Sequence, residues 1–491
     1  MSVVSEPATR LAFDESHSTS RASTVRVNGV MSVVCQGTST RASGWERSTL
    51  PERAAWARRF RAGLVARAEE LLQAVEAEVH KPKWEALTSD LLPLLAACKW
   101  HERYAPRLLR PRVCRGGAWW SLGQRHELAR APVGLVGIIA TWNYPIQLLG
   151  VQLLQALMAG NDVVIKPSER SPRTQELLVR LAQQAGLPEG ALRAHPATRD
   201  AGRTMLMQDR LNHLVFTGST SVGREIAAIA AARLLPTTLE LSGRDSAIVL
   251  ADADPALAAR SIWNAVTMNA GQTCMAPRRV LVERANYRAF LYHLAPLVAG
   301  AKPRRLIDAG AASMCFELAS AAVLAGGRSL SGVLESPSLE RLVPLAIVDC
   351  PAESGLVRGE HFGPVVAVVP VDHAEEGVQV HRQASAGHML ATSVFARDVR
   401  RARGLAASLG SAIVTINDCV LPTGDPRVSI AGSGPSGWGM SRGEAGLLAM
   451  TRPVHVASTS GWLRLPLKIP TTAAATRISG FMLGRYGSSS G

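Results

Sequence analysis

Short runs of branched apolar residues alternate with amphipathic segments from residue 131 to residue 269, and this alternation restricts the fold more than any other feature of the chain. Strands are predicted at 133–140, 162–166, 214–217, 238–241 and 247–250. Helices are predicted at 145–158, 171–185, from the glycine-rich turn at 218–223 to 232, and at 255–269. The cycle starts again after Arg278, with strands near 280–282, 365–371, 393–395 and 412–416. We therefore predict an α/β fold of two units, each a parallel sheet covered by helices.

The first strand and helix of this series lie in a stretch, 131–160, that contains no charged side chain. A membrane-spanning helix needs about 20 continuous apolar residues. Pro132, Gly134, Asn143 and Pro145 interrupt this stretch. It therefore predicts a buried strand, a tight turn and a buried helix, and no membrane span.

The charge balance is basic, because 54 Lys and Arg stand against 39 Asp and Glu and give a net charge of +15. A basic surface attracts nucleic acid and anionic lipid. The arginines are dispersed, however, and neither a zinc-finger spacing nor a contiguous basic tract accompanies them. We expect solvated helix faces and no specific nucleic-acid partner.

The seven cysteines form no Cys-x-x-Cys pair and no short-spaced cluster with His. This spacing predicts neither a disulfide framework nor a metal site. Scattered thiols are typical of a reducing compartment, and the first thirty residues are rich in Ser, Thr and Arg without the apolar core of a signal peptide. We expect a cytoplasmic protein.

The segments outside the alternation are simpler. Residues 1–48 are expected to form a disordered extension, in which Met31 is a second candidate start. A helix is predicted at 50–80, one or two more at 81–115, and a β-arm at 118–128, where Trp119 and Trp120 lie. The tail after residue 466 is expected to be flexible.

Several polar residues stand where strands of such a fold end. The run 216–223, FTGSTSVG, leaves a strand and opens a helix, so its amides can meet a phosphate, although such glycines also serve plain strand–helix packing. Glu240 ends an apolar strand, where it is either a catalytic base or a surface residue. Asn143 stands at a turn, where Asn often serves only to stabilise the turn. Cys274, taken singly, is more typical of a buried apolar residue than of a nucleophile.

The motifs become specific when they are read together. They follow one another as TWNYP, KPSE, FTGSTSVG, ELSG, GQTC and EHFGPV. In this order and spacing the chain resembles the aldehyde dehydrogenase superfamily over about residues 50–465, and the runs at 417–427 and 436–439 resemble later landmarks of that family. The resemblance implies a Rossmann-like cofactor-binding domain, an α/β catalytic domain and a small β oligomerisation arm.

The resemblance also implies a reaction. Cys274 would attack the aldehyde as a thiolate and form a thiohemiacetal. The side-chain amide of Asn143 and the backbone N–H of Cys274 would hold the oxyanion. After hydride transfer leaves a thioester, Glu240 would activate the water that hydrolyses it to the carboxylic acid.

The cofactor implied is NAD, with NADP as a second possibility. A carboxylate at Glu169 accepts a hydrogen bond from a free 2′-hydroxyl and repels a 2′-phosphate, which favours NAD. Lys166 would bind the same ribose, that of the adenosine. Glu360 would bind the nicotinamide ribose, and Phe362 would flank it. The residues carried over as cofactor-binding are Trp142, Lys166, Ser168, Glu169, Gly218, Ser219, Gly223, Glu360 and Phe362.

Four departures from the family pattern concern the surroundings of the site. Thr141 replaces a Pro, 242–244 reads Ser-Gly-Arg in place of Gly-Gly-Lys, 429–432 lacks the usual aromatic, and 304–342 matches poorly. They leave open a catalytically impaired relative that acts as a structural or binding protein. A CoA-acylating relative is a further alternative, against which the presence of Glu240 argues.

The expected domain boundaries follow the same resemblance. They are 1–48 for the extension, 49–116 and 131–242 for the cofactor domain, 243–440 for the catalytic domain, 117–130 and 450–466 for the arm, and 467–491 for the tail. An arm with unpaired strand edges favours a homodimer or a homotetramer. The substrate expected is a small-molecule aldehyde, with an apolar medium-chain, long-chain or aromatic compound as a guess.

Overall fold

The computed structural model describes residues 25–27, 30–32, 43–117, 121, 123–459 and 472–487. The chain divides into a segment of residues 1–42 and a compact body of residues 43–491. In the first segment, β1 (Val25–Val27) and β2 (Val30–Ser32) pair antiparallel.

The first large sheet carries the expected strands in a doubly wound order. Its strands run β20-β9-β8-β5-β6-β7 across the sheet. They are β5 (Leu135–Ile139), β6 (Asp162–Lys166), β7 (Leu192–Ala194), β8 (His213–Thr217), β9 (Thr237–Glu240) and β20 (Gly437–Trp438). All but β20 are parallel. The strand order reverses between β5 and β8, and in open α/β sheets ligands bind beyond the carboxyl ends of the strands at that point.

Helix α5 (Gln147–Met158) explains the charge-free stretch. It packs on β5 and β6 and also on α1 (Leu50–Ala66) and α4 (Leu92–Leu108), so all of its residues are buried. A helix covered on every side has no polar face, which confirms the predicted buried strand and helix. None of the described helices is both long and apolar enough to cross a membrane.

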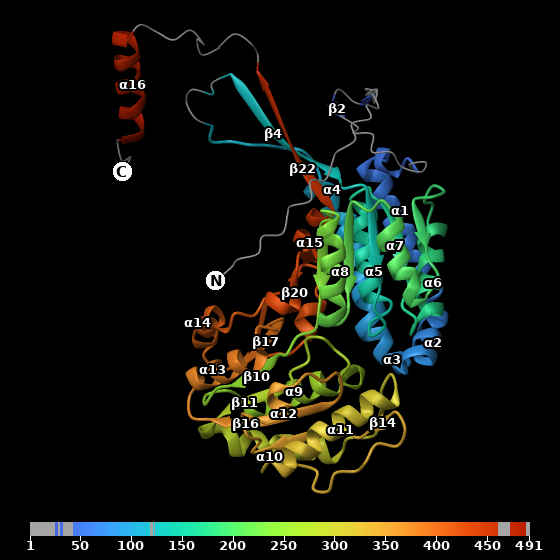
Figure 1. The fold of residues 1–491 in the computed structure, drawn as a ribbon, viewed down its shortest axis with the longest axis vertical. Helices are drawn as coiled ribbons and strands as arrows, with labels where there is room; N and C mark the ends of the chain where they lie inside the picture. Colours follow the sequence, from blue (N-terminus) through green and yellow to red (C-terminus); the bar gives the residue numbers. More distant parts are fainter. Residues whose placement is uncertain are drawn as a thin grey trace, which may run out of the picture. The chain divides into compact units, whose positions relative to one another are not determined.

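The remaining helices of this part complete the layers. Figure 1 shows them around this sheet: α2 and α6 pack in the same core as α5, whereas α7 and α8 pack in the core on the opposite face. Their bounds are α2 (Ala68–Val79), α3 (Lys83–Ala86), α6 (Pro172–Gln184), α7 (Arg199–Gln208) and α8 (Thr220–Ala232). The predicted helix at 50–80 is broken at Arg67, whose φ of −114° and ψ of 23° are not helical.

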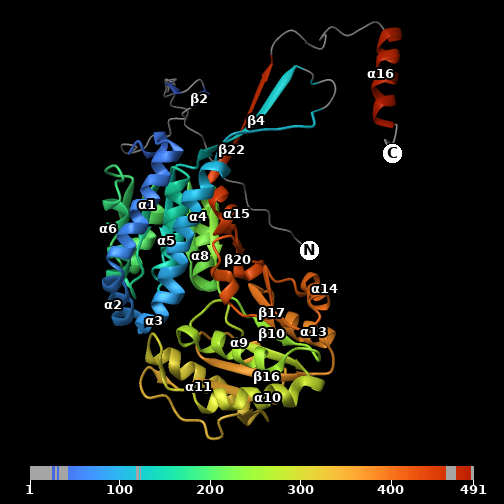
Figure 2. The ribbon, with the colours of Figure 1, turned by 180° about the vertical axis from the view of Figure 1, so that it is seen from behind.

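The second large sheet runs β13-β15-β16-β11-β10-β17-β18 and is parallel except for β13. Its strands are β10 (Ser246–Val249), β11 (Arg279–Glu283), β13 (Arg328–Ser329), β15 (Leu345–Val348), β16 (Val365–Val371), β17 (Ala391–Phe395) and β18 (Ile413–Ile416). Val280 and Val282 join the core that contains residues of α9 (Pro255–Thr267) and α10 (Arg284–Ala299). Leu281 joins the opposite core, with α11 (Ala309–Leu324), α13 (Ala374–Ser385) and α14 (Val399–Leu409) (Figure 2). This period of two buries both faces of the sheet.

A third, smaller sheet pairs segments that lie far apart in the sequence. β4 (Gln124–Pro132) pairs antiparallel with β22 (Thr451–Thr459) along their whole lengths, and β3 (Arg112–Val113) adds to the other edge of β4. Most of both long strands is exposed or half-buried. Trp119, Trp120 and residues 460–466 of the expected arm lie outside the described residues.

Three segments differ from the sequence-based expectations. The expected extension 1–48 is too long, because Trp45 is buried and its Nε1 donates to the Leu157 carbonyl at 2.9 Å. Residues 437–438, expected in the catalytic domain, form β20 at the edge of the first sheet. Within the expected flexible tail, Thr472–Gly487 form α16.

Candidate active site

Asn143 connects the first sheet to the loop that carries Cys274. It follows β5 and is 4% exposed. Its Nδ2 donates to the Gln272 carbonyl at 3.1 Å, and its Oδ1 accepts from Thr141 Oγ1 at 3.2 Å. Thr141, a departure from the family pattern, therefore helps to orient the amide so that Nδ2 faces the Cys274 loop.

A buried ion pair holds the Asn143 turn from below. Lys81 Nζ pairs with Asp90, both side chains are fully buried, and Lys81 Nζ also donates to the Asn143 carbonyl at 2.9 Å. Asp90 Oδ1 accepts from the amides of Ile146 and Gln147 at 3.2 Å each. No pattern in the neighbouring residues predicts that Lys81 and Asp90 are buried and paired. The only hint is that Lys is scarce in this chain.

Cys274 lies against a small apolar cluster that includes Met275 and Ile430. Burial raises the pKa of its thiol to about 11, and the charge of Glu240 acts in the same direction, whereas Arg442 and Arg278 lower it. The resting group is therefore a neutral thiol. Nucleophilic attack requires its proton to be removed at the moment of reaction.

Glu240 is a held carboxylate and not a surface residue at a sheet edge. It ends β9, which β20 covers on the outer side. Gln152 Nε2, from α5, donates to Glu240 Oε1 at 3.1 Å and to Thr217 Oγ1 at 2.9 Å. The charge of Glu240 acts on Cys274 and raises the pKa of its thiol. Its position after a buried strand was the signal in the sequence.

The residues assigned to the adenosine ribose lie together at the end of β6. Lys166 and Glu169 form an ion pair, in which Lys166 is nearly buried and Glu169 is 43% exposed. Partial burial, the largest single influence, raises the pKa of Glu169, but the hydrogen bond and charge of Lys166, a backbone hydrogen bond at Glu169 and the charge of Arg199 together lower it. The Ser168 hydroxyl accepts from the Arg170 amide at 3.2 Å and shapes the turn.

The turn after β8 fits a dinucleotide phosphate. Ser219 caps α8 by accepting from the Val222 amide, and the first amides of a helix have no partner within it. A Cβ at Gly218 would lie 2.4 Å from the Phe216 ring, and one at Gly223 would lie 2.5 Å from Leu241. The glycines therefore let strand and helix approach closely, and the open helix end stands beside the strand reversal.

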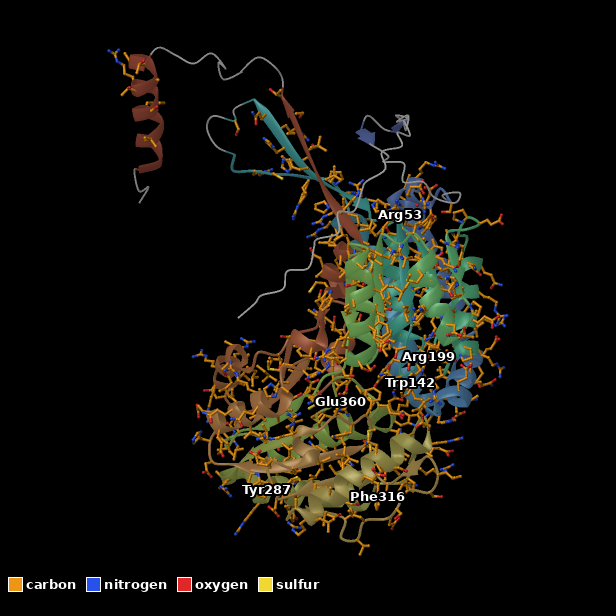
Figure 3. The ribbon with its side chains drawn as sticks, in the orientation of Figure 1. Arg53, Trp142, Arg199, Tyr287, Phe316 and Glu360 are labelled. Atoms are coloured by element: carbon orange, nitrogen blue, oxygen red, sulfur yellow. The ribbon has the colours of Figure 1, made fainter. Side chains whose placement is uncertain are left out.

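Trp142, Phe362 and Glu360 lie where the segments after β5 and before β16 meet. Trp142 and Phe362 pack edge to face, with ring centroids 5.9 Å apart. Figure 3 labels Trp142 and Glu360. The Glu360 carboxylate lies 3.5 Å from Arg244 Nη2. Arg244, which departs from the family pattern, therefore contacts Glu360, the residue assigned to the nicotinamide ribose.

Arg278 and Asp245 carry no motif and form a buried layer under the Cys274 loop, with 2% and 1% of their surface exposed. Asp245 Oδ1 accepts from the amides of Leu390 and Ala391 at 3.0 and 2.8 Å. Burial raises the pKa of Asp245 to about 7. In the part of the chain that the structure describes, no three His, Cys, Asp or Glu side chains group as metal ligands.

A family profile described as "Aldehyde dehydrogenase family" matches residues 19–456. The chain belongs to the aldehyde dehydrogenase family. It is similar to a 4,4'-diapolycopene aldehyde oxidase of Methylomonas sp, with 28% identity over 91% of this chain and 85% of the relative. It is also similar to a putative NADP⁺ succinate-semialdehyde dehydrogenase of Mycobacterium ulcerans, with 28% identity over 88% of this chain and 85% of the relative.

A solved structure gives the same assignment. The crystal structure of a Mycobacterium tuberculosis aldehyde dehydrogenase complexed with NAD⁺ superposes with a TM-score of 0.78 and 26% identity, over 86% of this chain and 88% of that one. The predicted Rossmann-like α/β fold is confirmed. This aldehyde dehydrogenase is an NAD(P)-dependent oxidoreductase that converts an aldehyde to the carboxylic acid.

Proposed function

We propose that Cys274 is the nucleophile, that Asn143 Nδ2 and the Cys274 N–H hold the oxyanion, and that Glu240 is the base. The hydrogen bond from Asn143 to the carbonyl of Gln272 carries this proposal, because it joins an amide of the first sheet to the nucleophile loop. Removing one oxyanion donor typically costs about 10²–10³ in rate.

The chain's own residues then act in two stages. Cys274 releases its proton to solvent water, Sγ bonds to the aldehyde carbon, and the carbonyl oxygen becomes the oxyanion. The bound cofactor supplies the hydride acceptor. The resulting thioester is attacked by a water whose proton passes to Glu240, and the carbon–sulfur bond breaks to release the acid and the thiolate.

We propose that Lys166 and Glu169 bind the adenosine ribose, the turn at 218–223 binds the pyrophosphate, and Glu360 and Phe362 bind the nicotinamide end. The exposed, ionised carboxylate of Glu169 favours NAD over NADP, because it repels a 2′-phosphate.

The substrate that we propose is an aldehyde with a carboxylate on its tail. Arg442 is 8% exposed, lines a small cavity with Gln147 and Val151, and acts electrostatically on Cys274. Its Nη1 donates to the Thr423 carbonyl at 3.1 Å, and Arg442 takes part in none of the ion pairs among the described residues. Asp425, which lines the same cavity, pairs with Arg427 instead. A buried cation without a counter-charge favours an anionic ligand. The semialdehyde relatives support this choice over the apolar aldehyde expected from the sequence.

NADH formation without CoA tests the reaction. We expect turnover by the wild type, none by Cys274→Ala, and a single burst by Glu240→Gln, because acylation proceeds and hydrolysis stops. Turnover by Cys274→Ala would refute the assignment of the nucleophile.

The ratio of kcat/KM for succinic semialdehyde to that for butanal tests the substrate. We expect Arg442→Met to lower this ratio about 10–100-fold, since a hydrogen bond to a charged group contributes about 1.5–3 kcal/mol. Activity toward butanal serves as the control. An unchanged ratio would exclude Arg442 as the carboxylate anchor and leave the reaction itself untouched.

We further propose a cytoplasmic homo-oligomer joined through the arm of β4 and β22. The exposed strands of the arm support association, because unpaired strand edges are liabilities in a monomer. The scattered cysteines support a reducing compartment. Light scattering of the full chain distinguishes a dimer or tetramer from a monomer, and a monomer would refute the proposal.

A further inference from the structure

Arg278 binds the backbone of the loop that carries Cys274. Its guanidinium is buried, and it donates through Nη1 to the Gly271 carbonyl at 3.1 Å and through Nη2 to the Thr273 carbonyl at 2.7 Å. Its guanidinium carbon lies 5.5 Å from the centroid of the Phe362 ring. One side chain therefore contacts two backbone carbonyls of the loop before Cys274 and the ring assigned to the nicotinamide end.

The bond to Thr273 sets the direction of the Cys274 amide. The Thr273 carbonyl and the Cys274 N–H belong to one planar trans peptide, so they point in opposite directions. Arg278, together with the Ala276 amide at 3.2 Å, holds that carbonyl, and the N–H is thereby turned the other way. Among the described residues no hydrogen-bond acceptor is recorded for the Cys274 N–H, which leaves the donor available to a ligand.

The rest of the loop cannot turn independently. The Gln272 carbonyl accepts from Asn143 Nδ2 and from Asn269 Nδ2 at 3.1 and 3.0 Å. Gly271 has a left-handed φ of +71°, and a Cβ there would lie 2.3 Å from the backbone of Gly363. Three successive carbonyls are thus held by side chains, and Arg278 holds the first and the third.

We propose that Arg278 is a positioning residue of the oxyanion site, which aims the Cys274 N–H at the reacting carbonyl by holding the Gly271 and Thr273 carbonyls. The inference rests on the proposed roles of Cys274 and Asn143. The planar fork of arginine is required, since the single ammonium of a lysine does not reproduce two parallel hydrogen bonds. The positive charge also favours the thiolate of Cys274.

Arg278→Lys separates geometry from charge, and two cofactor-free reactions of Cys274 provide the readout. Acylation by p-nitrophenyl acetate passes through an oxyanion, as Sγ bonds to the acetyl carbon and p-nitrophenolate leaves. Alkylation by iodoacetamide depends on the thiolate but forms no oxyanion. We expect Arg278→Lys to slow acylation about 10–100-fold, because the Cys274 N–H no longer points at the oxyanion. The rate of alkylation should stay within about threefold of the wild-type rate at each pH.

Arg279→Lys is the matched control. Arg279 is equally buried, but it donates to the Arg244 carbonyl and to Ser385, away from the nucleophile loop. It should leave the ratio of acylation to alkylation unchanged even if it lowers Tm. The proposal would be overturned if Arg278→Lys acylated at the wild-type rate, or if its acylation and alkylation rates fell in parallel. The same fall in the acylation rate of Arg279→Lys would also overturn it. Labelling that persists in Cys274→Ala would instead overturn the proposed nucleophile.

Discussion

Replacing Lys81 by methionine removes one half of a buried ion pair and leaves the other half uncompensated. Both side chains are fully buried, and Asp90 also accepts the amides of Ile146 and Gln147 at the start of α5. Breaking such a pair by removing one partner costs about 3–5 kcal/mol. We therefore expect Lys81→Met to lower Tm by on the order of 10 °C, for a cooperative part of roughly 150–250 residues.

The double variant separates the charge from the contacts. Asp90→Asn keeps an Oδ1 that accepts the two amides, so Lys81→Met combined with Asp90→Asn removes both charges and preserves the start of α5. Replacing a whole buried pair is often neutral or stabilising. The double variant should therefore be more stable than Lys81→Met, with Tm within a few degrees of the wild type.

The same perturbation reaches the active site. Asn143 would lose the Lys81 donor to its carbonyl but keep the bond from Asn269 Nδ2 at 2.8 Å. We expect kcat to fall by less than the roughly 10²–10³ of a lost oxyanion donor, both in Lys81→Met and in the double variant. Differential scanning fluorimetry and steady-state NADH formation measure the two effects. A Tm of Lys81→Met equal to that of the wild type, or a double variant less stable than the single, would refute this reasoning.

Three further predictions concern the cofactor, the pH dependence and the base. Glu169→Ala removes the charge that repels a 2′-phosphate and frees Lys166 from its ion pair, so the ratio of kcat/KM with NADP to that with NAD should rise about tenfold or more, equivalent to about 1.4 kcal/mol; an unchanged ratio would count against the ribose assignment. The pKa of Asp245 is raised by burial from 3.8 to about 7, so the folded protein retains a proton that the unfolded chain has released, and stability should fall as pH rises through that window. Asp245→Asn should abolish this part of the dependence, which a comparison of Tm at pH 5 and pH 8 measures; parallel curves would contradict the shift. Gln152→Leu removes a hydrogen bond to Glu240 at 3.1 Å, so deacylation should slow and the NADH burst should grow relative to the steady rate. A change in KM alone, with the burst and the steady rate unchanged, would exclude a role of Gln152 in holding the base.

The parts predictable from the sequence are those in which the local pattern of apolar and polar residues reflects how the segment is buried. A strand buried on both faces, such as β16, and a helix buried on all sides, such as α5, are apolar throughout. The turns after β5, β8 and β9 were located because polar motifs interrupt those apolar runs. The order of the motifs also predicted the family, which the profile match over residues 19–456 confirms.

Only the tertiary structure brought the distant partners together. Asn143 meets Gln272 across 129 residues, and Lys81 meets Asn143 across 62. A lone Lys, Asp or Arg in a sequence is ordinarily solvated, and nothing in its neighbours says whether another segment will cover it. The burial of Lys81 and Arg278, and the pKa of Cys274, therefore depend on how the segments pack against one another.

The sequence by itself determined the α/β alternation and the buried α5, and it supplied the groups that we propose for the chemistry, because solvent exposure and backbone preference act over a few neighbouring residues. The tertiary structure alone decided which carbonyls Arg278 and Lys81 hold and that Arg244 engages Glu360. Hydrogen bonds and ion pairs form only over a few ångströms, and that proximity is set by packing between segments that the local pattern does not relate.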